Sequence, residues 1–446
     1  MTVFVVIVAV VAVLALLGLV HRWLWVRLVR DTTRPGGPAR RTGTALALVL
    51  PLLSLAALTA GRAGAPFWLQ RLVAWPGFMW LAVLLYLTLA MLVAEPVRRL
   101  WLRRLARSAV RTGEAAAEVA AGRASHVPAA RGAGASPAGA PPAAEPDVLP
   151  TVAPPAPDAE PGRSPDAAPA DGVTRRVFVA RTVGGAAVAA AGLTVGTGTY
   201  GVLRGPRVKR VQVPLAKLPR AAHGFRIAVV SDVHLGPVLG RAHTRRIVDT
   251  VNRTQPDLIA VVGDLVDGNV HDLGPAAEPL RELRARHGSF FVTGNHEYFS
   301  GAQQWVDHVR ELGLTPLENA RRELPHFDLA GVNDVQGEKE GKGPDFQAAL
   351  GDRDRSRTSV LLAHQPIVID EAVRHGVDLQ LSGHTHGGQL WPGNYLAELA
   401  NPTVAGLERY GDTQLYVSRG AGAWGPPVRV GAPSDITVVE LASYQA

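Results

Sequence analysis

Three long uncharged apolar runs near the N-terminus constrain the fold more than any other feature of this chain. They extend from Val3 to Val20, from Thr42 to Ala60 and from Leu72 to Ala94. A helix rises 1.5 Å per residue, so runs of this length can cross a bilayer core of roughly 30 Å. Uncharged runs this long are rare in soluble cores. We therefore predict three membrane-spanning helices, in keeping with a composition of 47% hydrophobic and 19% charged residues.

The charges around these runs indicate how the helices cross the membrane. The segment between the second and third runs carries only two charged residues, Arg62 and Arg71, whereas the strongly basic segment "RRLWLRRLARSAVR" follows the third run. Because basic loops stay in the cytoplasm, we expect the N-terminus outside and the chain inside after the third span. This membrane region covers residues 1–111. The loop between the first two runs carries one acidic residue, Asp31, against Arg22, Arg27, Arg30, Arg34, Arg40 and Arg41.

Residues 112–173 have a different composition. They are rich in Ala, Pro and Gly, as in "SPAGAPPAAEPDVLPTVAPPAPDAEPG", with almost no large apolar residues. A segment of this composition cannot bury a core and stays disordered. We therefore predict a cytoplasmic linker.

Residues 174–206 combine a basic start with a mildly apolar stretch. Arg175 and Arg176 precede Phe178, and an Ala/Gly/Val-rich run extends from Thr182 to Leu203. The pattern resembles a twin-arginine export signal, which would make the twin-arginine translocase a partner. The alternative is a fourth membrane helix with ordinary basic flanks. Both interpretations carry the chain out of the cytoplasm, and without a clear cleavage site we expect the segment to remain as an anchor.

Residues 207–446 are predicted to form one α/β domain. Short apolar runs such as "FRIAVVS" and "DLIAVVG" indicate strands, and periodic segments such as "HTRRIVDTVNRT" indicate helices between them. Runs this apolar suit strands buried on both faces. We therefore expect sheets covered by further layers of secondary structure.

Polar residues that can bind metals follow five of these strands directly. In an open α/β sheet, ligands gather beyond the carboxyl ends of the strands, so these residues could meet at one edge. Any one of them alone would be an ordinary surface or turn residue, but five such strand ends together point to one shared site. With no cysteine in the chain, a metal must be held by nitrogen and oxygen ligands. The candidates are Asp232, His234, Asp264, Asn295, His364, His384 and His386.

Seven candidate ligands are too many for one ion with room for a substrate. Two ions about 4 Å apart, sharing one carboxylate, would use them all and leave positions for water and substrate. A water between two such cations loses its proton near neutral pH and becomes a nucleophile, while the cations neutralise phosphoryl oxygens. The set therefore predicts phosphoester hydrolysis. Ligands of this kind admit Mn, Fe, Zn or Ni.

The motifs also resemble those of a known family. Asp-x-His, Gly-Asp, Gly-Asn-His-Glu, a lone His after a strand and Gly-His-x-His occur in this order between about Phe225 and Leu441. Together they resemble the signature of the calcineurin-like metallophosphoesterases. The resemblance implies a four-layer αββα sandwich, a dimetal site bridged by Asp264, and His296 as the general acid that contacts phosphate. It assigns Asp232, His234 and His386 to the first ion, and Asn295, His364 and His384 to the second.

Four further residues have predicted roles with open alternatives. Asp267 could orient a ligand histidine, although a turn-capping role is at least as plausible, and Glu297 could give similar support. Arg419 or Arg429 could hold a second phosphate, but a rigid Gly/Pro turn is the plainer interpretation of "SRGAGAWGPPVRVG". That segment and "GGQLWPG" resemble the membrane-anchored bacterial branch of the family, which includes relatives acting on lipid-linked UDP-sugars.

The sequence thus predicts a multi-pass cell-membrane protein that presents a dimetal phosphohydrolase outside the cytoplasm. Its substrate would be a phosphomonoester or phosphodiester, including lipid-linked or cell-envelope-linked ones. One alternative is a pyrophosphatase acting on a UDP-sugar lipid. Another is an inactive binding module on a membrane stem, against which the complete ligand set argues. Nucleic-acid binding is not expected, because the net charge of +8 comes largely from arginines that form no basic stripe with aromatics in the C-terminal half.

Overall fold

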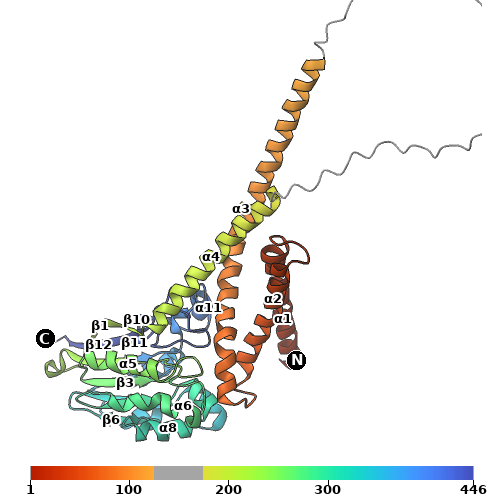
Figure 1. The fold of residues 1–446 in the computed structure, drawn as a ribbon. Coiled ribbons are helices and arrows are strands. Elements are labelled where there is room, and N and C mark those ends of the chain that lie inside the picture. The colour runs from red at the N-terminus through yellow and green to blue at the C-terminus, as the bar shows by residue number, and fades with distance from the viewer. Residues whose placement is uncertain (1, 125–173, 445–446) are drawn as a thin grey trace, which may run out of the picture. The chain divides into compact units, whose positions relative to one another are not determined.

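Four long helices precede the globular domain in the computed structural model, which describes residues 2–124 and 174–444 (Figure 1). All four are long and apolar enough to cross a membrane, as the sequence predicted for three spans and an anchor. The π-helical segment η1 (Val26–Arg30) extends the first of them. The four helices are α1 (Thr2–Trp25), α2 (Pro38–Thr59), α3 (Phe67–Ala124) and α4 (Arg175–Leu203).

Helix α3 is longer than the predicted membrane region. It continues to Ala124, past the predicted boundary at residue 111, because its last turns are rich in Ala, Glu and Arg, which favour helix. The rest of the predicted linker, residues 125–173, lies outside the described residues. Met1–Val93 and Gly184–Ala446 form one compact unit, and Ala94–Val183 form another.

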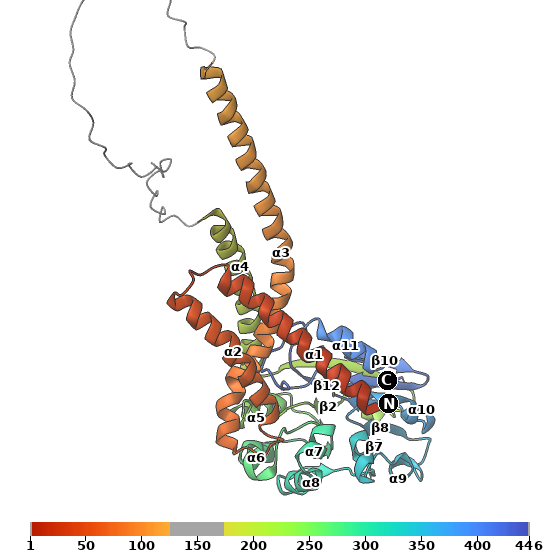
Figure 2. The same cartoon turned by 90° about the vertical axis from the view of Figure 1, so that its right-hand side faces the viewer.

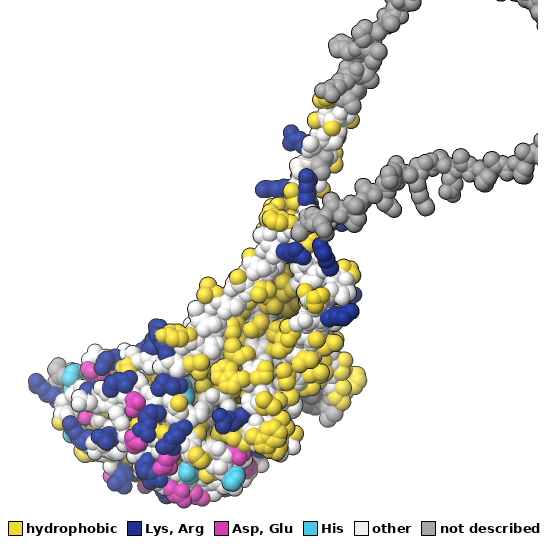
Figure 3. Space-filling model, in the orientation of Figure 1, with side chains coloured by type: hydrophobic (Ala, Val, Ile, Leu, Met, Phe, Trp, Pro, Cys, Tyr) yellow, Lys and Arg dark blue, Asp and Glu magenta, His cyan; other side chains and the backbone are white. Residues whose placement is uncertain are grey.

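The N-terminal helices expose many apolar side chains. Leu14 and Leu19 of α1 are exposed, and so are Leu48 and Leu52 of α2. Figure 3 shows the apolar side chains gathered over the helices, while charged side chains spread over the globular domain. Apolar surface of this extent is typical of contact with a membrane.

Two six-stranded sheets form the globular domain (Figures 1 and 2). Their strand orders are β1-β12-β2-β3-β4-β5 and β10-β11-β9-β8-β7-β6. Strands β2, β3 and β4 are parallel neighbours, and so are β7, β8 and β9. Parallel neighbours place their carboxyl ends at one edge of a sheet. The strands are β1 (Arg207–Leu215), β2 (Phe225–Val230), β3 (Leu258–Val262), β4 (Ser289–Val292), β5 (Thr315–Pro316), β6 (Ala320–Glu323), β7 (Phe327–Gly331), β8 (Thr358–Leu362), β9 (Leu379–Ser382), β10 (Gly406–Tyr410), β11 (Thr413–Val417) and β12 (Asp435–Ser443).

Three apolar cores hold the sheets and helices in four layers. Side chains alternate along each strand, so Ile227 and Val229 enter the core between the sheets, whereas Ala228 and Val230 enter the core under α5, α6 and α8. A third core lies under α9 and α10. The predicted αββα arrangement is thereby confirmed. The helices are α5 (Arg241–Arg253), α6 (Val270–Ala277), α7 (Asn295–Ser300), α8 (Ala302–Glu311), α9 (Phe346–Leu350), α10 (Ile369–Arg374) and α11 (Gly393–Ala400), with 3-10 turns η2 (Arg220–Ala222), η3 (Glu278–Glu282), η4 (Val335–Glu340), η5 (Pro366–Val368) and η6 (His386–Gly388).

The beginning of α3 packs against the globular domain. Phe67 joins the core under α5, α6 and α8. The Tyr86 hydroxyl donates a hydrogen bond to the carbonyl oxygen of Trp391, at 3.0 Å. Figures 1 and 2 agree in placing the first turns of α3 beside α6. The first compact unit therefore joins membrane-type helices to the domain that carries the predicted ligands.

One buried histidine lies outside the predicted site. His243 of α5 is 1% exposed, and neither of its ring nitrogens has a hydrogen-bond partner. Burial, and then the neighbouring Arg246 and Arg429, lower the pKa of His243 to about 3. The folded protein therefore keeps this ring neutral at pH values where an unfolded histidine takes up a proton.

We expect His243→Leu to make the protein less sensitive to acid. The unfolded histidine titrates near pH 6.5, so the wild type should lose about 1.4 kcal/mol of stability at this position between pH 7.5 and 5.5. Leucine removes that loss and the unpaired ring nitrogens. The measurement is the thermal unfolding midpoint of both proteins in one detergent at the two pH values. Equal drops in the midpoint for both would contradict the prediction.

Candidate metal centre

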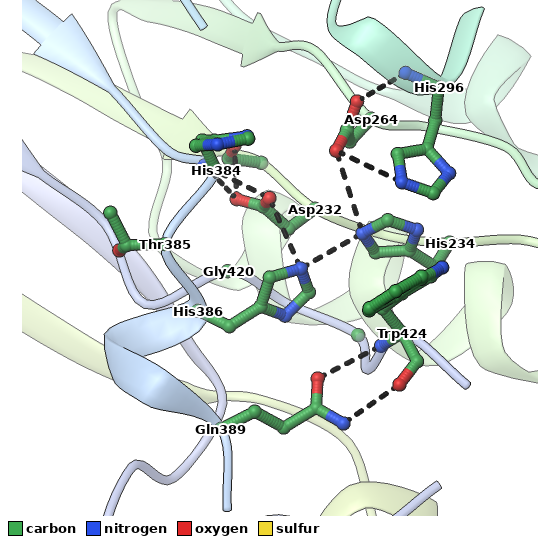
Figure 4. Close-up of polar contacts among 12 residues, drawn as sticks. Asp232, His234, Asp264, His296, His384, Thr385, His386, Gln389, Gly420 and Trp424 are labelled. Atoms are coloured by element: carbon green, nitrogen blue, oxygen red, sulfur yellow. Dashed lines mark hydrogen bonds and ion pairs between the residues drawn. The ribbon is translucent and has the colours of Figure 1, made fainter. Parts of the chain in front are cut away.

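The predicted ligands converge at one edge of the two sheets, from segments far apart in the sequence. Figure 4 labels Asp232, His234, Asp264, His384 and His386 among them. Strands β2, β3 and β4 of the first sheet end there, and so do β8 and β9 of the second. All seven predicted ligands are buried or half-buried. They are Asp232 and His234 after β2, Asp264 after β3, Asn295 after β4, His364 after β8, and His384 and His386 after β9.

Asp232, His234 and His386 form a first group of donors. The two histidine Nε2 atoms lie 2.9 Å apart, and Asp232 Oδ1 lies 3.4 Å from His386 Nε2. Atoms that share an ion about 2.1 Å away lie roughly 3.0 to 3.4 Å from one another. Two imidazole nitrogens and a carboxylate oxygen at this spacing could hold a divalent cation.

Asp264, His364 and His384 form a second group. One donor atom from each lies within 4.8 Å of the others. His364 Nε2 is 3.1 Å from Asp264 Oδ2 without the geometry of a hydrogen bond. The Nδ1 atom of His384 lies 3.0 Å from Asn295 Oδ1, which adds an amide oxygen to the group. This group could hold a second cation.

The carboxylate of Asp264 lies between the two groups. Its Oδ2 atom is 3.1 Å from His364 Nε2 and 3.8 Å from His234 Nε2. Its Oδ1 atom accepts the backbone N–H of His296 at 2.9 Å. A carboxylate in this place is positioned to be shared by two ions, as the sequence predicted for Asp264.

Five of the candidate ligands have a left-handed backbone. The φ angles are 53° at Asp232, 50° at His234, 53° at Asp264, 73° at His384 and 53° at His386. Such angles cost a non-glycine residue about 1 kcal/mol or more, and they cluster at functional sites. They turn the chain sharply after each strand, which brings side chains from β2, β3 and β9 into the same space.

Two glycines permit the close approach of these turns. A Cβ atom at Gly383 would lie 1.8 Å from Ser231 Oγ and 2.4 Å from Asp232 Oδ2. A Cβ atom at Gly294 would lie 2.3 Å from Asp264 Oδ1. Any other residue at either position would displace a candidate ligand. Glycine at these two positions is therefore a packing requirement.

Comparison with known proteins identifies the family to which this arrangement of donors belongs. The family profile described as "Calcineurin-like phosphoesterase" matches residues 225–388. An uncharacterized metallophosphoesterase of Aquifex aeolicus (strain VF5) is 35% identical over 240 residues, which cover 53% of this chain and 91% of that relative. The chain belongs to the calcineurin-like metallophosphoesterases. The sequence resemblance to this family is thereby confirmed.

Longer relatives are similar over the same part of the chain. A Danio rerio protein named "Transmembrane protein with metallophosphoesterase domain" is 38% identical over 266 residues, covering 56% of this chain and 61% of the relative. An uncharacterized metallophosphoesterase of Helicobacter pylori (strain J99 / ATCC 700824) is 39% identical over 247 residues, covering 55% and 66%. The chain thus spans less than two thirds of the length of these relatives. Its apolar helices and the transmembrane relative associate it with a membrane.

Buried charges in the metallophosphoesterase site balance one another. Burial opposes the charged form of His234, but the carboxylates, Asp267 above all, outweigh it and raise its pKa to about 9. Burial likewise opposes charge on His364 and on Asp264, yet their mutual attraction raises the pKa of His364 and lowers that of Asp264. The protons on His234 and His364 thus balance the negative charge of the buried carboxylates. Divalent cations could replace these protons, because they supply the same charge.

The other two histidines among the candidate ligands stay neutral. Burial, followed by the nearby His364, lowers the pKa of His384 to about 4. Burial and the charge of His234 lower the pKa of His386 in the same way. A neutral imidazole is the form that binds a metal, so these two rings are ready to act as ligands.

The two predicted supporting carboxylates, Asp267 and Glu297, contact different parts of the site. Asp267 Oδ1 lies 2.9 Å from His234 Nδ1 and 2.6 Å from His296 Nδ1, which is the position of a carboxylate that orients both rings. Glu297 is fully buried and fixes the backbone instead. It accepts the backbone N–H groups of Asp264, Leu265 and Gly294, at 3.0, 2.7 and 2.6 Å.

The two arginines predicted as candidates to hold a second phosphate lie in different surroundings. Arg429 is buried, and it donates to the carbonyl oxygens of Gly422 and His386 at 2.6 and 3.0 Å. Another of its nitrogens lies 3.0 Å from His386 Nδ1. These contacts hold the turn that carries His386. Arg419 lines a separate cavity of about 290 Å³ beside Gly387.

Sequence reasoning missed the contact that joins the two segments quoted for their resemblance to the bacterial branch. The side-chain amide of Gln389 donates to the carbonyl oxygen of Trp424 and accepts the Trp424 backbone N–H, both at 2.9 Å (Figure 4). The Trp424 ring then lies 5.8 Å from the His296 ring, and Phe299 lies 5.5 Å from it. Neither segment carries a local pattern that could have signalled this pairing.

Proposed function

We propose that this chain is a membrane-anchored phosphohydrolase that uses two divalent metal ions to hydrolyse phosphomonoesters or phosphodiesters. The observation that carries the proposal is the position of Asp264 between two groups of donors, in a chain of this family. Asp264 would be shared by both ions. The first ion would be held by Asp232, His234 and His386, and the second by Asn295, His364 and His384.

The residues around these donors suit the proposed chemistry. When bound, two divalent ions would neutralise phosphoryl oxygens and lower the pKa of a water molecule. His296 lies at the half-buried edge of the site, with Nδ1 held by Asp267 and Nε2 4.0 Å from Asp264 Oδ2. Its Nε2 atom would carry the proton that the leaving oxygen needs. Mn, Fe and Zn all suit these nitrogen and oxygen donors.

Metal removal tests this proposal. We expect the full-length protein in detergent to lose hydrolysis of p-nitrophenyl phosphate and bis-p-nitrophenyl phosphate by about 100-fold or more after chelation, because the ions supply the charge that the phosphoryl group needs. Adding Mn, Fe or Zn should restore it, with roughly two ions bound per chain by elemental analysis. Chelator-resistant hydrolysis would contradict the proposal.

Two alternative functions would give results different from those expected for this phosphohydrolase. A pyrophosphatase acting on a UDP-sugar lipid would cleave that lipid faster than simple esters, and the membrane helices favour this possibility. An inactive binding module would contain no tightly bound metal and hydrolyse neither substrate. The donor groups and their supporting contacts argue against the inactive module, because every predicted ligand is present.

We also propose that the catalytic domain lies outside the cytoplasm and that the four helices make the protein multi-pass. Support comes from the first compact unit, where the turn between α2 and α3 lines a cavity together with His234. The basic loops assign that turn to the outside. Helix α4 ends at Leu203, just before β1, so the domain follows on the far side of that span.

A reporter fusion tests this orientation. We expect alkaline phosphatase fused after Ala446 to be active, because this enzyme works only outside the cytoplasm. If the twin-arginine translocase exports the domain, replacing Arg175 and Arg176 by lysine should silence the reporter, while Arg181→Lys in the same helix should not. An active reporter in the double variant would instead favour an ordinary membrane helix. A silent wild-type fusion would contradict the proposed orientation.

A further inference from the structure

A cavity of about 400 Å³ opens directly onto the candidate metal centre. His234, Asp267 and His296 line its polar end. A cavity of this size can hold a small molecule together with part of an apolar substituent. The site is thus continuous with a partly open cavity that extends beyond the metal ligands.

The other end of the cavity is formed by the membrane-type helices. Leu58 of α2 lines it together with Phe67, Phe78 and Leu81 of α3. Helix α3 contacts the globular domain here, because Phe67 packs against the core under α5, α6 and α8. A Cβ atom built at Gly425, beside Trp424, would touch the Phe78 ring at 3.8 Å. The apolar wall is therefore part of the same compact unit as the site.

Two aromatic side chains lie between the polar and apolar ends. Phe299 and Trp424 line the cavity, and both pack edge-on against the His296 ring. Gln389 holds the backbone of Trp424 by the paired hydrogen bonds described above. An apolar group that passes these rings would next meet the apolar side chains of α2 and α3 that line the cavity.

We propose that the substrate is an amphiphilic phosphoester, whose phosphate lies at the metal centre and whose long apolar chain lies in this cavity against α2 and α3. The inference rests on the proposed phosphohydrolase function and names its substrate class. A water-soluble phosphoester gains nothing from the apolar wall. A lipid chain gains about fourfold in affinity for each CH₂ group that it buries there.

Matched esters test the inference on the full-length protein in mixed micelles of fixed composition. The probes are p-nitrophenyl methyl phosphate and p-nitrophenyl dodecyl phosphate as diesters, with methyl phosphate and dodecyl phosphate as monoesters. We expect kcat/KM to be about 100-fold or more higher for the dodecyl member of the pair that the enzyme accepts. The two pairs also distinguish monoester from diester lipids.

Variants of the wall separate binding in the cavity from simple partition into micelles. Phe78→Ala should lower kcat/KM for the dodecyl ester about tenfold and leave the methyl ester unchanged. The control is Leu72→Ala, an exposed position on the same helix, which should change neither. If Phe78→Ala impairs both esters, the fold is damaged, and Leu58→Ala, on α2 in the same apolar wall, decides instead.

The outcomes distinguish this inference from the function on which it rests. Equal rates for methyl and dodecyl esters, or a chain preference that survives both wall variants, would overturn the lipid substrate while leaving the phosphohydrolase intact. Failure to hydrolyse any ester with Mn, Fe or Zn would overturn the phosphohydrolase itself. A dodecyl preference that is lost in the wall variants alone supports both.

Discussion

Replacing Asp264 by alanine is expected to lower kcat by about 1,000-fold or more for any phosphoester. The physical reason is the place of this carboxylate, whose Oδ2 atom lies between His364 and His234 of the two donor groups. Removing it would leave two like-charged ions without the anion that they share. At least one ion should then bind weakly, and the charge needed by the phosphoryl group would be lost.

The fold should survive this change better than the activity does. Asp264 lies on a turn whose backbone is fixed by Glu297, which accepts the N–H groups of both Asp264 and Leu265. The measurements are kcat, bound metal per chain and the circular dichroism spectrum of the full-length protein. Asp412→Ala, a fully exposed carboxylate on a turn, is the matched control and should change none of them. A variant at Asp264 that keeps near-wild-type rates would remove the basis for a shared-carboxylate site.

The sequence predicted those parts of the site that depend on strand order alone. Candidate ligands follow strands directly, so their meeting requires only that parallel strands end at one edge, as β2, β3, β4, β8 and β9 do. The apolar runs predicted that further layers cover the strands on both faces, while the four-layer arrangement came from the resemblance to the family. Asp267 could be suspected because it lies three residues after Asp264, within the same turn.

Other parts depend on contacts between segments that carry no matching pattern. Nothing in a single sequence pairs Gln389 with Trp424, or directs Arg429 to the turn of His386. The packing of Phe67 and Phe78 beside the site is also invisible, because a membrane-type run looks the same whether it meets lipid or protein. The end of α3 was missed for a local reason, since alanine is common both in linkers and in helices.

The left-handed turns at the strand ends are another feature that the sequence did not predict. Aspartate and histidine adopt such angles more readily than most residues, but a positive φ remains uncommon for any residue other than glycine, and five of the seven candidate ligands have one. The sequence shows glycine directly before Asp264, Asn295 and His384, but it does not show why glycine is needed there. At Gly383 the reason is the close approach of Asp232, which lies 151 residues earlier in the sequence. Such distances can be found only in three dimensions.

Replacing His296 by glutamine is expected to lower kcat by about 100-fold or more for esters with alkyl leaving groups, because an alkoxide must be protonated as it leaves. The effect should be far smaller for p-nitrophenyl esters, whose leaving group is stable without a proton. His296 is placed for this role at the edge of the site, where Asp267 holds its Nδ1 atom and leaves Nε2 on the side of Asp264. Glutamine keeps the length and polarity of the side chain but cannot donate a proton in this way.

The dependence on the leaving group separates proton donation from a structural role. A residue that only shapes the site would lower the rates for alkyl and p-nitrophenyl esters equally. Bound metal should remain near the wild-type value in His296→Gln, since His296 is not among the seven ligands proposed for the two ions, although it forms a further donor group with His234 and Asp267. His271→Gln, an exposed histidine at the start of α6, is the matched control and should leave both rates unchanged. Equal losses on both kinds of ester, with metal retained, would show that His296 positions the substrate and that the leaving oxygen takes its proton from another source.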